Sequence, residues 1–369
     1  MLDFTSALYL GLEHPTSSLA AWPRLTLGKP AALDELGDTA ELERTLAELV
    51  GCESAVLGTS TLHLFSDLIP FLTKSGGSVC LDEGSYPIAR WGVERSAGAG
   101  ACWTNFAHYD ADALAAMLAR QPRARPVVVT DGFCPACGRT APLSDYSQIA
   151  ADAGGLVVVD DTQALGIFGT PDNCLPYGKG GGGSLQMTAK RLDNVVVVSS
   201  LAKAFGVPMA MLGGASPLVA AFRQSSATRI HCSPPSAAVL AAARYALEVN
   251  ASRGDALRRN LAGRVARFRA GLADLGLLSV PGCFPVQPLG LPAHAARVVH
   301  RRLLRGSVRS VLQKGSTEGS FRVSFVFTAQ HRLSEIARAL EVLGDAPAPA
   351  PARFFKEWKG AKSNGVRIS

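Results

Sequence analysis

Three runs of valine, each followed by polar residues, constrain most strongly how this chain can fold. They lie at Val127–Val129, Val157–Val159 and Val195–Val198. Uninterrupted β-branched runs of this length are typical of strands buried on both faces of a parallel sheet. The carboxyl ends of parallel strands meet at one edge, where open α/β sheets bind their ligands. We therefore expect an α/β fold with a functional site at that edge.

A lysine follows the third valine run. Lys203 lies in the segment Ser-Leu-Ala-Lys-Ala-Phe-Gly at residues 200–206. Burial disfavours the charged form of a lysine, and lysines tuned in this way form Schiff bases. A lysine that extends its amine from a strand end into solvent is the alternative interpretation.

An aspartate ends the second valine run. Asp160 opens the segment Asp-Asp-Thr-Gln-Ala-Leu-Gly at residues 160–166. A carboxylate at a strand end can hold a pyridinium nitrogen protonated, which pyridoxal phosphate needs when it acts as an electron sink. A helix N-cap is the alternative for Asp160 taken alone. Together with Lys203, Asp160 indicates a pyridoxal-phosphate site.

These two segments resemble the fold-type I pyridoxal-phosphate enzymes and, within them, the α-oxoamine synthases. The lysine segment is similar to the family motif T-x-G-K-x-F-G, and the acidic segment to D-(D/E)-A-H-x-x-G. The resemblance extends from about Tyr9 to Leu343. It implies an aspartate-aminotransferase-like fold: a mostly parallel seven-stranded sheet in an αβα large domain, and a small C-terminal α+β domain.

The resemblance also assigns residues to the cofactor site. Lys203 would hold pyridoxal 5'-phosphate as a Schiff base, Asp160 would contact the ring nitrogen and Tyr86 would stack on the ring. The remaining positions implied for cofactor binding are Ser60, Thr61, Leu62, Asp131, Gln163, Ser200, His231 and Cys232. For Ser60 a plain N-cap, and for His231 a loop before a helix, are the alternatives. Arg322 would grip the substrate carboxylate bidentately.

Two of these positions depart from the family. Tyr86 and Gln163 stand where the family has histidine. Tyrosine can still stack on a pyridine ring and glutamine can donate a hydrogen bond, but neither titrates near neutral pH. Lys203 is therefore expected to carry the protons during catalysis.

The expected activity is condensation of a cofactor-stabilised amino-acid carbanion with an acyl thioester or another electrophile in specialised metabolism. The co-substrate would be an acyl-CoA, an acyl-carrier protein or a nucleotide-containing molecule. Transamination, or β/γ-elimination or replacement on an activated amino acid such as S-adenosylmethionine, is the first alternative. A non-catalytic partner subunit and a cofactor-free binding protein are alternatives of other classes. Residues 230–235 resemble a segment that crosses a dimer interface, which implies a homodimer.

Composition sets the remaining limits. The chain has 369 residues, 47% of them hydrophobic, and a net charge of +7 without a nucleic-acid-binding motif. We expect an N-terminal segment at 1–37, a large cofactor-binding domain at 38–235, a small domain at 236–345, and a Pro/Ala linker with a basic tail at 346–369. The sequence shows neither a basic signal-peptide start nor an unbroken apolar span, so a cytoplasmic protein without membrane contact is expected.

A C-x-x-C pair and a run of glycines are two further features of the sequence. The eight cysteines are scattered, and Cys134 and Cys137 form the only C-x-x-C pair. Without a second pair at zinc-site spacing, we expect no metal; a redox role for this pair is the alternative. The glycine run at residues 180–183 predicts a flexible loop, with an active-site gate as the less favoured interpretation.

Overall fold

The structure is a computed structural model that describes residues 1–74, 76–120, 125–188, 191–280, 282–291, 293–314 and 321–344. The chain divides into two compact units. The large unit contains residues 12–134 and 140–255, and the small unit contains residues 1–11, 135–139 and those from 256 onward. The expected domain boundaries at residues 37, 235 and 345 stay predictions, and the tail from residue 346 lies outside the described residues.

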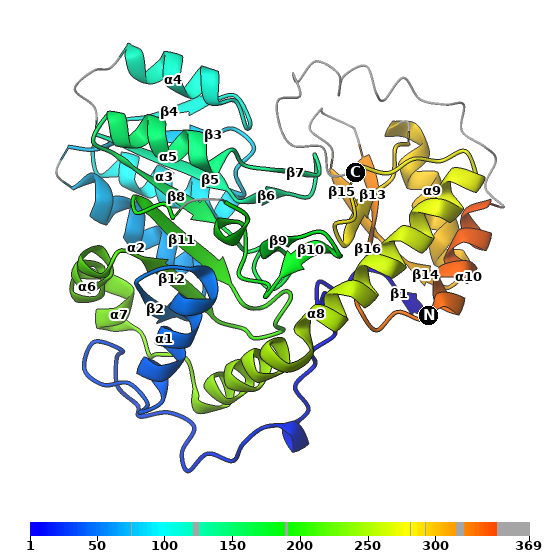
Figure 1. Ribbon diagram of the computed structural model, residues 1–369, viewed down its shortest axis with the longest axis horizontal. Helices are drawn as coiled ribbons and strands as arrows, with labels where there is room; N and C mark the ends of the chain where they lie inside the picture. The colour runs from blue at the N-terminus through cyan, green and yellow to red at the C-terminus, as the bar shows by residue number, and fades with distance from the viewer. Residues whose placement is uncertain are drawn as a thin grey trace. The chain divides into compact units, whose positions relative to one another are not determined.

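A seven-stranded sheet forms the centre of the large unit, in the order β2, β12, β11, β8, β5, β3, β4 (Figure 1). Strand β12 is antiparallel to both neighbours, and the other neighbouring pairs are parallel. The strands are β2 (Ser54–Gly58), β3 (Ser78–Asp82), β4 (Trp103–Phe106), β5 (Pro126–Asp131), β8 (Leu156–Asp160), β11 (Val195–Ser200) and β12 (Ala210–Gly214). The three valine runs are the buried centres of β5, β8 and β11, so the expected mostly parallel sheet is confirmed.

Helices cover both faces of this sheet, which gives the expected αβα layers. One apolar cluster joins every second residue of the strands to α2 (Thr61–Thr73), α3 (Pro87–Gly98) and α6 (Ser216–Ser225). Helix α5 (Leu143–Asp152) contacts β5 and β8 without taking part in that cluster, and it lies on the opposite face (Figure 1). Also in the large unit are α1 (Thr39–Val50), α4 (Ala111–Ala119), α7 (Ala227–His231), β9 (Thr170–Asp172), β10 (Leu175–Lys179) and the short 3-10 helices Thr16–Ser18 and Leu185–Met187.

Helix α1 differs in one detail from its sequence pattern. The segment 38–41, Asp-Thr-Ala-Glu, is typical of a capping box. Asp38 is the N-cap residue, but its side chain makes no capping hydrogen bond. Its carboxylate instead lies 2.5 Å from Nη1 of Arg244. The ion pair with a distant arginine therefore replaces the local cap.

The small unit is an α+β structure, as expected. Its three-stranded antiparallel sheet has the order β13, β16, β15, and a separate parallel pair joins β1 to β14. Its elements are β1 (Leu2–Asp3), β13 (Val286–Pro288), α9 (Ala293–Arg305), β14 (Val308–Arg309), β15 (Val311–Lys314), β16 (Phe321–Val326) and α10 (Leu333–Gly344). Helix α8 (Ala237–Asp274) contributes its second half to this unit.

His331 has a structural role in this unit. Its Nδ1 accepts a hydrogen bond from the Thr328 N–H at 2.9 Å, and its Nε2 donates to the Asp3 carbonyl at 2.9 Å. Its ring stacks on Phe4, with the ring centres 4.5 Å apart. His331 therefore holds the residues around Asp3 and Phe4 to the segment at Thr328.

No helix among the described residues is both long and apolar enough to span a membrane.

Candidate active site

Polar residues at the carboxyl ends of parallel strands form the site. Asp82, Asp131, Asp160 and Ser200 end β3, β5, β8 and β11, which lie side by side in the order β11, β8, β5, β3. Asp131 and Asp160 are direct partners in the pairing of β5 with β8. The parallel arrangement thus brings together carboxylates that are far apart in the sequence, at the edge where the valine runs placed the site.

Lys203 lies in a tight turn just beyond β11. The N–H of Gly206 donates to the Lys203 carbonyl at 3.1 Å, and the turn is closed by Leu201, which bonds to Met209 and Val207. Burial lowers the pKa of the Lys203 amine, while the nearby carboxylates Asp160 and Asp131 oppose this effect. A half-buried amine of this kind is easier to deprotonate, which is the form that attacks a carbonyl.

Asp160 faces this lysine from the neighbouring strand. Its carboxylate accepts a hydrogen bond from the Thr162 N–H at 3.0 Å. Burial raises the pKa of Asp160, and Thr162 and Lys203 counteract that rise. Burial and the charge of Asp160 also raise the pKa of Asp131 well above its usual value. Two buried carboxylates this close favour a positive group beside them.

Tyr86 brings an aromatic ring to the same place. Its ring centre lies 5.9 Å from Nζ of Lys203, and its N–H donates to Oδ1 of Asp131 at 3.1 Å. The side chain is 53% exposed although α3 begins directly after it. An exposed ring beside a half-buried amine provides a surface on which a flat ligand attached to that amine can stack.

The N-terminus of α2 follows β2 at the same edge of the sheet. Ser60 caps this helix and accepts a hydrogen bond from the His63 N–H, and its hydroxyl lies 2.7 Å from Nδ1 of His63. The first-turn N–H groups include those of Thr61, which is buried, and Leu62, which is 40% exposed. Such a terminus is suited to a phosphate because its N–H groups and the helix dipole both favour an anion.

The glycine run has a defined path, contrary to the expected flexible loop. Gly181 accepts a hydrogen bond from Gly166, and Gly183 donates one to Phe168. Asp161, which is buried, accepts hydrogen bonds from the N–H and hydroxyl of Ser184 at 2.9 and 2.5 Å. Burial raises the pKa of Asp161 to about 7. The loop therefore packs around this carboxyl.

The remaining expected site residues are placed as follows. Gln163 is half-buried in the turn after Asp161, and Ser200 receives a hydrogen bond on its hydroxyl from the Ala202 N–H. His231 is the exposed last residue of α7, and Cys232 follows it. Arg322 lies on β16 of the small unit, opposite Gln313. No described contact joins these last three residues to Lys203.

Sequence reasoning missed three residues around the lysine. The Thr162 hydroxyl accepts the Ser200 N–H at 3.0 Å and so links the ends of β8 and β11. Nε2 of His14 donates to the Phe205 carbonyl at 2.6 Å, which fixes the turn that carries Lys203. His63 completes the cap of α2. Only Thr162 had a local signal, because it lies two residues after Asp160.

The residues fit pyridoxal phosphate. The structure offers a half-buried amine, a buried carboxylate for the ring nitrogen, an aromatic face and a helix N-terminus for the phosphate. These four features lie along one sheet edge, the arrangement by which fold-type I enzymes hold this cofactor.

Comparison with known proteins agrees. The aminotransferase class I and II family matches residues 1–343. An 8-amino-7-oxononanoate synthase from Sodalis glossinidius is 31% identical over 94% of this chain and 88% of its own length. One from Methylococcus capsulatus is also 31% identical, over 94% and 89%. A serine palmitoyltransferase from S. paucimobilis, solved with bound PLP and myriocin, has the same fold: the TM-score is 0.81 at 20% identity, covering 93% of this chain and 86% of that one.

The chain thus belongs to the aminotransferase class I and II family and is a pyridoxal-phosphate-dependent transferase. Within that family it is a C–C bond-forming acyltransferase of the α-oxoamine synthase type.

Proposed function

We propose that Lys203, Asp160 and Tyr86 form the catalytic centre and that the enzyme joins the α-carbon of an amino acid to the acyl group of a thioester. The observation that carries this proposal is that the Lys203 amine lies 5.9 Å from the centre of the Tyr86 ring and close enough to the carboxylates of Asp160 and Asp131 for their charges to act on it. When bound, pyridoxal phosphate delocalises the electron pair left on the amino-acid α-carbon after a bond to it breaks.

Each residue at this sheet edge would have its own role in binding the cofactor or in moving protons. Lys203 would hold the cofactor through its amine and would also be the group that moves a proton to or from the amino-acid α-carbon. Asp160 keeps the ring nitrogen protonated, and that positive charge offsets the cost of burying two carboxylates. Tyr86 covers the ring on the side of the amine. The first turn of α2, with Ser60, Thr61 and Leu62, and Ser200 hold the phosphate.

Gln163 and Tyr86 leave this centre without the two histidines of the family. Histidine is the side chain that commonly exchanges protons near neutral pH, and this centre has none at those two positions. Lys203, with its lowered pKa, is the remaining nearby base. We propose that Gln163 donates a hydrogen bond to the cofactor and that Lys203 alone transfers protons.

Arg322 is proposed to bind the carboxylate of the amino acid substrate, because a guanidinium matches a carboxylate bidentately. The thioester partner would be an acyl-CoA or an acyl-carrier protein. The family resemblance of Arg322 and the net charge of +7, which suits an anionic carrier, support these assignments.

A homodimer is proposed as the working form, with His231 and Cys232 reaching the phosphate of the neighbouring subunit. Exposed apolar side chains support this. Ile230 is 43% exposed and Leu33 is 76% exposed, and the segments that carry them are joined by hydrogen bonds from Ala31 and Ala32 to Cys232 and Arg229. A monomer by light scattering would contradict the proposal.

A cytoplasmic location is also proposed. None of the eight cysteines, all of which lie in the described part of the chain, forms a disulfide bond, which suits a reducing compartment.

The first test is the absorption spectrum of the protein with pyridoxal phosphate. Wild type should show the visible band of a lysine-bound cofactor, and Lys203→Ala should lack it. Lys179→Ala is the matched control, because this lysine side chain is 62% exposed and pairs with Asp172. A band that survives in Lys203→Ala and disappears in Lys179→Ala would refute the assignment.

The second test separates the reaction types. The holoenzyme is incubated with glycine, alanine, serine or S-adenosylmethionine, each with and without acyl-CoA. Release of the CoA thiol that requires the amino acid, with a product whose mass equals the joined skeletons, is expected. Amino-group transfer to a 2-oxo acid, or loss of a side-chain substituent without thiol release, would contradict an acyltransferase.

A further inference from the structure

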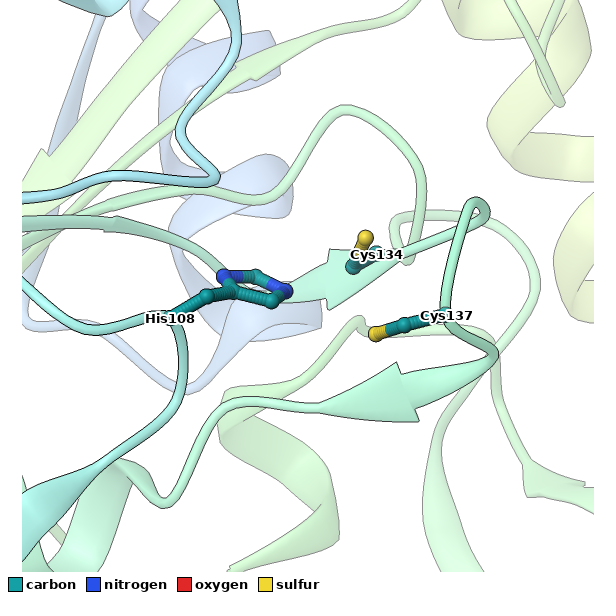
Figure 2. A group of neighbouring side chains, drawn as sticks. All are labelled: His108, Cys134 and Cys137. Carbon is teal, nitrogen blue, oxygen red and sulfur yellow. The ribbon is translucent and has the colours of Figure 1, made fainter. Parts of the chain in front are cut away.

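One histidine and two cysteines lie together beside the end of β5. His108 comes from the loop between β4 and α4, and Cys134 ends β6 (Phe133–Cys134). Cys137 lies in the turn that leads to β7 (Arg139–Thr140). One ligand atom from each residue lies within 4.8 Å of the others. Figure 2 shows the imidazole of His108 directed toward the two sulfurs.

The orientation of His108 is fixed by a buried carboxylate. Its Nδ1 donates to Oδ1 of Asp82 at 2.7 Å, and the Asp82 side chain is fully buried. The ring stacks on Tyr109, with 3.9 Å between ring centres. A Cβ at Gly84 would lie 2.2 Å from Nδ1, so only glycine leaves room for the ring. With Nδ1 committed to Asp82, Nε2 is the ring nitrogen that can bind a metal.

This carboxylate–histidine pair is the outer arrangement that metal-binding histidines commonly have. Two cysteine sulfurs and one imidazole nitrogen form a donor set that zinc prefers. Bond lengths of about 2.3 Å to sulfur and 2.0 Å to nitrogen place tetrahedral ligand atoms roughly 3.5–3.8 Å apart. The observed separation of at most 4.8 Å is therefore within a small side-chain adjustment of that geometry.

Charge also favours such a site. Binding would release the two thiol protons, so two thiolates, one neutral imidazole and one divalent cation give a complex without net charge. Cys134 is 8% exposed, and a neutral complex is the form that burial tolerates. Cys137 and His108 are half-buried, which leaves access for a fourth ligand such as water.

We propose that His108, Cys134 and Cys137 bind one zinc ion, which would link the loop that carries His108 to the two cysteines of the C-x-x-C segment. The Tyr109 hydroxyl donates to the Asp131 carbonyl at 2.9 Å, so the residue stacked on His108 also contacts the strand end at the active site. The sequence marked the C-x-x-C pair, for which we expected no metal, but it did not indicate the third ligand, because His108 lies outside that segment.

Zinc content of the purified holoenzyme tests the proposal. Each protein is saturated with zinc sulfate, passed over a desalting column and analysed for metal, and bound zinc is then released with a mercurial reagent. Wild type should retain about one zinc per chain, and Cys134→Ser, Cys137→Ser and His108→Asn should retain almost none. Cys174→Ser is the matched control, because Cys174 is exposed and lies apart from the group, and it should behave as wild type.

Two measurements keep the test decisive if a ligand variant does not fold. Asp82→Asn should weaken zinc affinity by about 10-fold to 100-fold while the ligands remain. Cobalt in the wild-type protein should give the visible bands of a tetrahedral thiolate site. Failure of wild type to retain zinc, equal retention by Cys134→Ser and Cys174→Ser, or a disulfide between Cys134 and Cys137 in the zinc-treated protein would overturn the proposal.

Discussion

Adding one methyl group at Gly183 tests how the glycine run supports the active site. Gly183 has a φ of +93°, and a Cβ there would lie 1.9 Å from Oδ2 of Asp161. The methyl group must therefore displace the buried carboxyl that accepts both hydrogen bonds from Ser184. Gly183→Ala combines a backbone penalty with the loss of buried hydrogen bonding.

The magnitude follows from these two contributions. A left-handed backbone costs an alanine about 1–2 kcal/mol. Displacing a buried charged acceptor from one hydrogen bond costs about 1.5–3 kcal/mol. The expected loss in the free energy of unfolding is therefore about 2.5–5 kcal/mol, a large part of the stability of an ordinary domain.

Gly180 provides the matched control. Its φ is +83°, and a Cβ there would meet nothing within 4 Å. Gly180→Ala should lose only the backbone contribution, about 1–2 kcal/mol. Urea unfolding of both holoenzyme variants, followed by circular dichroism, measures the difference. Equal losses in the two variants would refute the reasoning, because contact with Asp161 would then contribute nothing.

Three further predictions concern the sheet edge. Burial raises the pKa of Asp161 from 3.8 to about 7, so between these pH values the folded state binds more protons than the unfolded state. The free energy of unfolding should therefore fall as pH rises through that window. Urea titrations of Asp161→Asn should show a smaller fall with pH than wild type, and an equal fall would contradict this assignment. Thr162→Val leaves the Ser200 N–H without its acceptor, and unfolding should become about 1–3 kcal/mol easier in the same assay. Asp160→Asn should keep the lysine-bound absorption band but lower kcat by roughly 100-fold or more, and a near-normal kcat would exclude its charge from catalysis.

The valine runs made the sheet and its functional edge predictable. A run such as Val195–Val198 is compatible with little besides a strand buried on both faces, and parallel strands of one sheet must end at the same edge. The positions of Asp160 and Lys203 at strand ends followed from these two facts.

Contacts between distant segments could not be predicted in this way. The bond from His14 to Phe205 and the approach of His108 to Cys134 depend on how loops cross the sheet edge. Neither residue has a periodic pattern or a spacing that marks it. The capping hydrogen bond that the sequence around Asp38 indicates is absent for a related reason. The Asp38 carboxylate pairs instead with Arg244, a contact that only the tertiary fold provides.

The pairing of β1 with β14 has a consequence for the order in which the protein folds. Leu2 pairs with Val308, and the fully buried ring of Phe4 packs between Phe325 and Phe327. During synthesis the first strand leaves the ribosome long before its partners exist. The central sheet can therefore assemble first, while the opening residues stay available until the last helices emerge. Folding of the small unit then joins residues 2–4 to residues 308–327, which are synthesised much later.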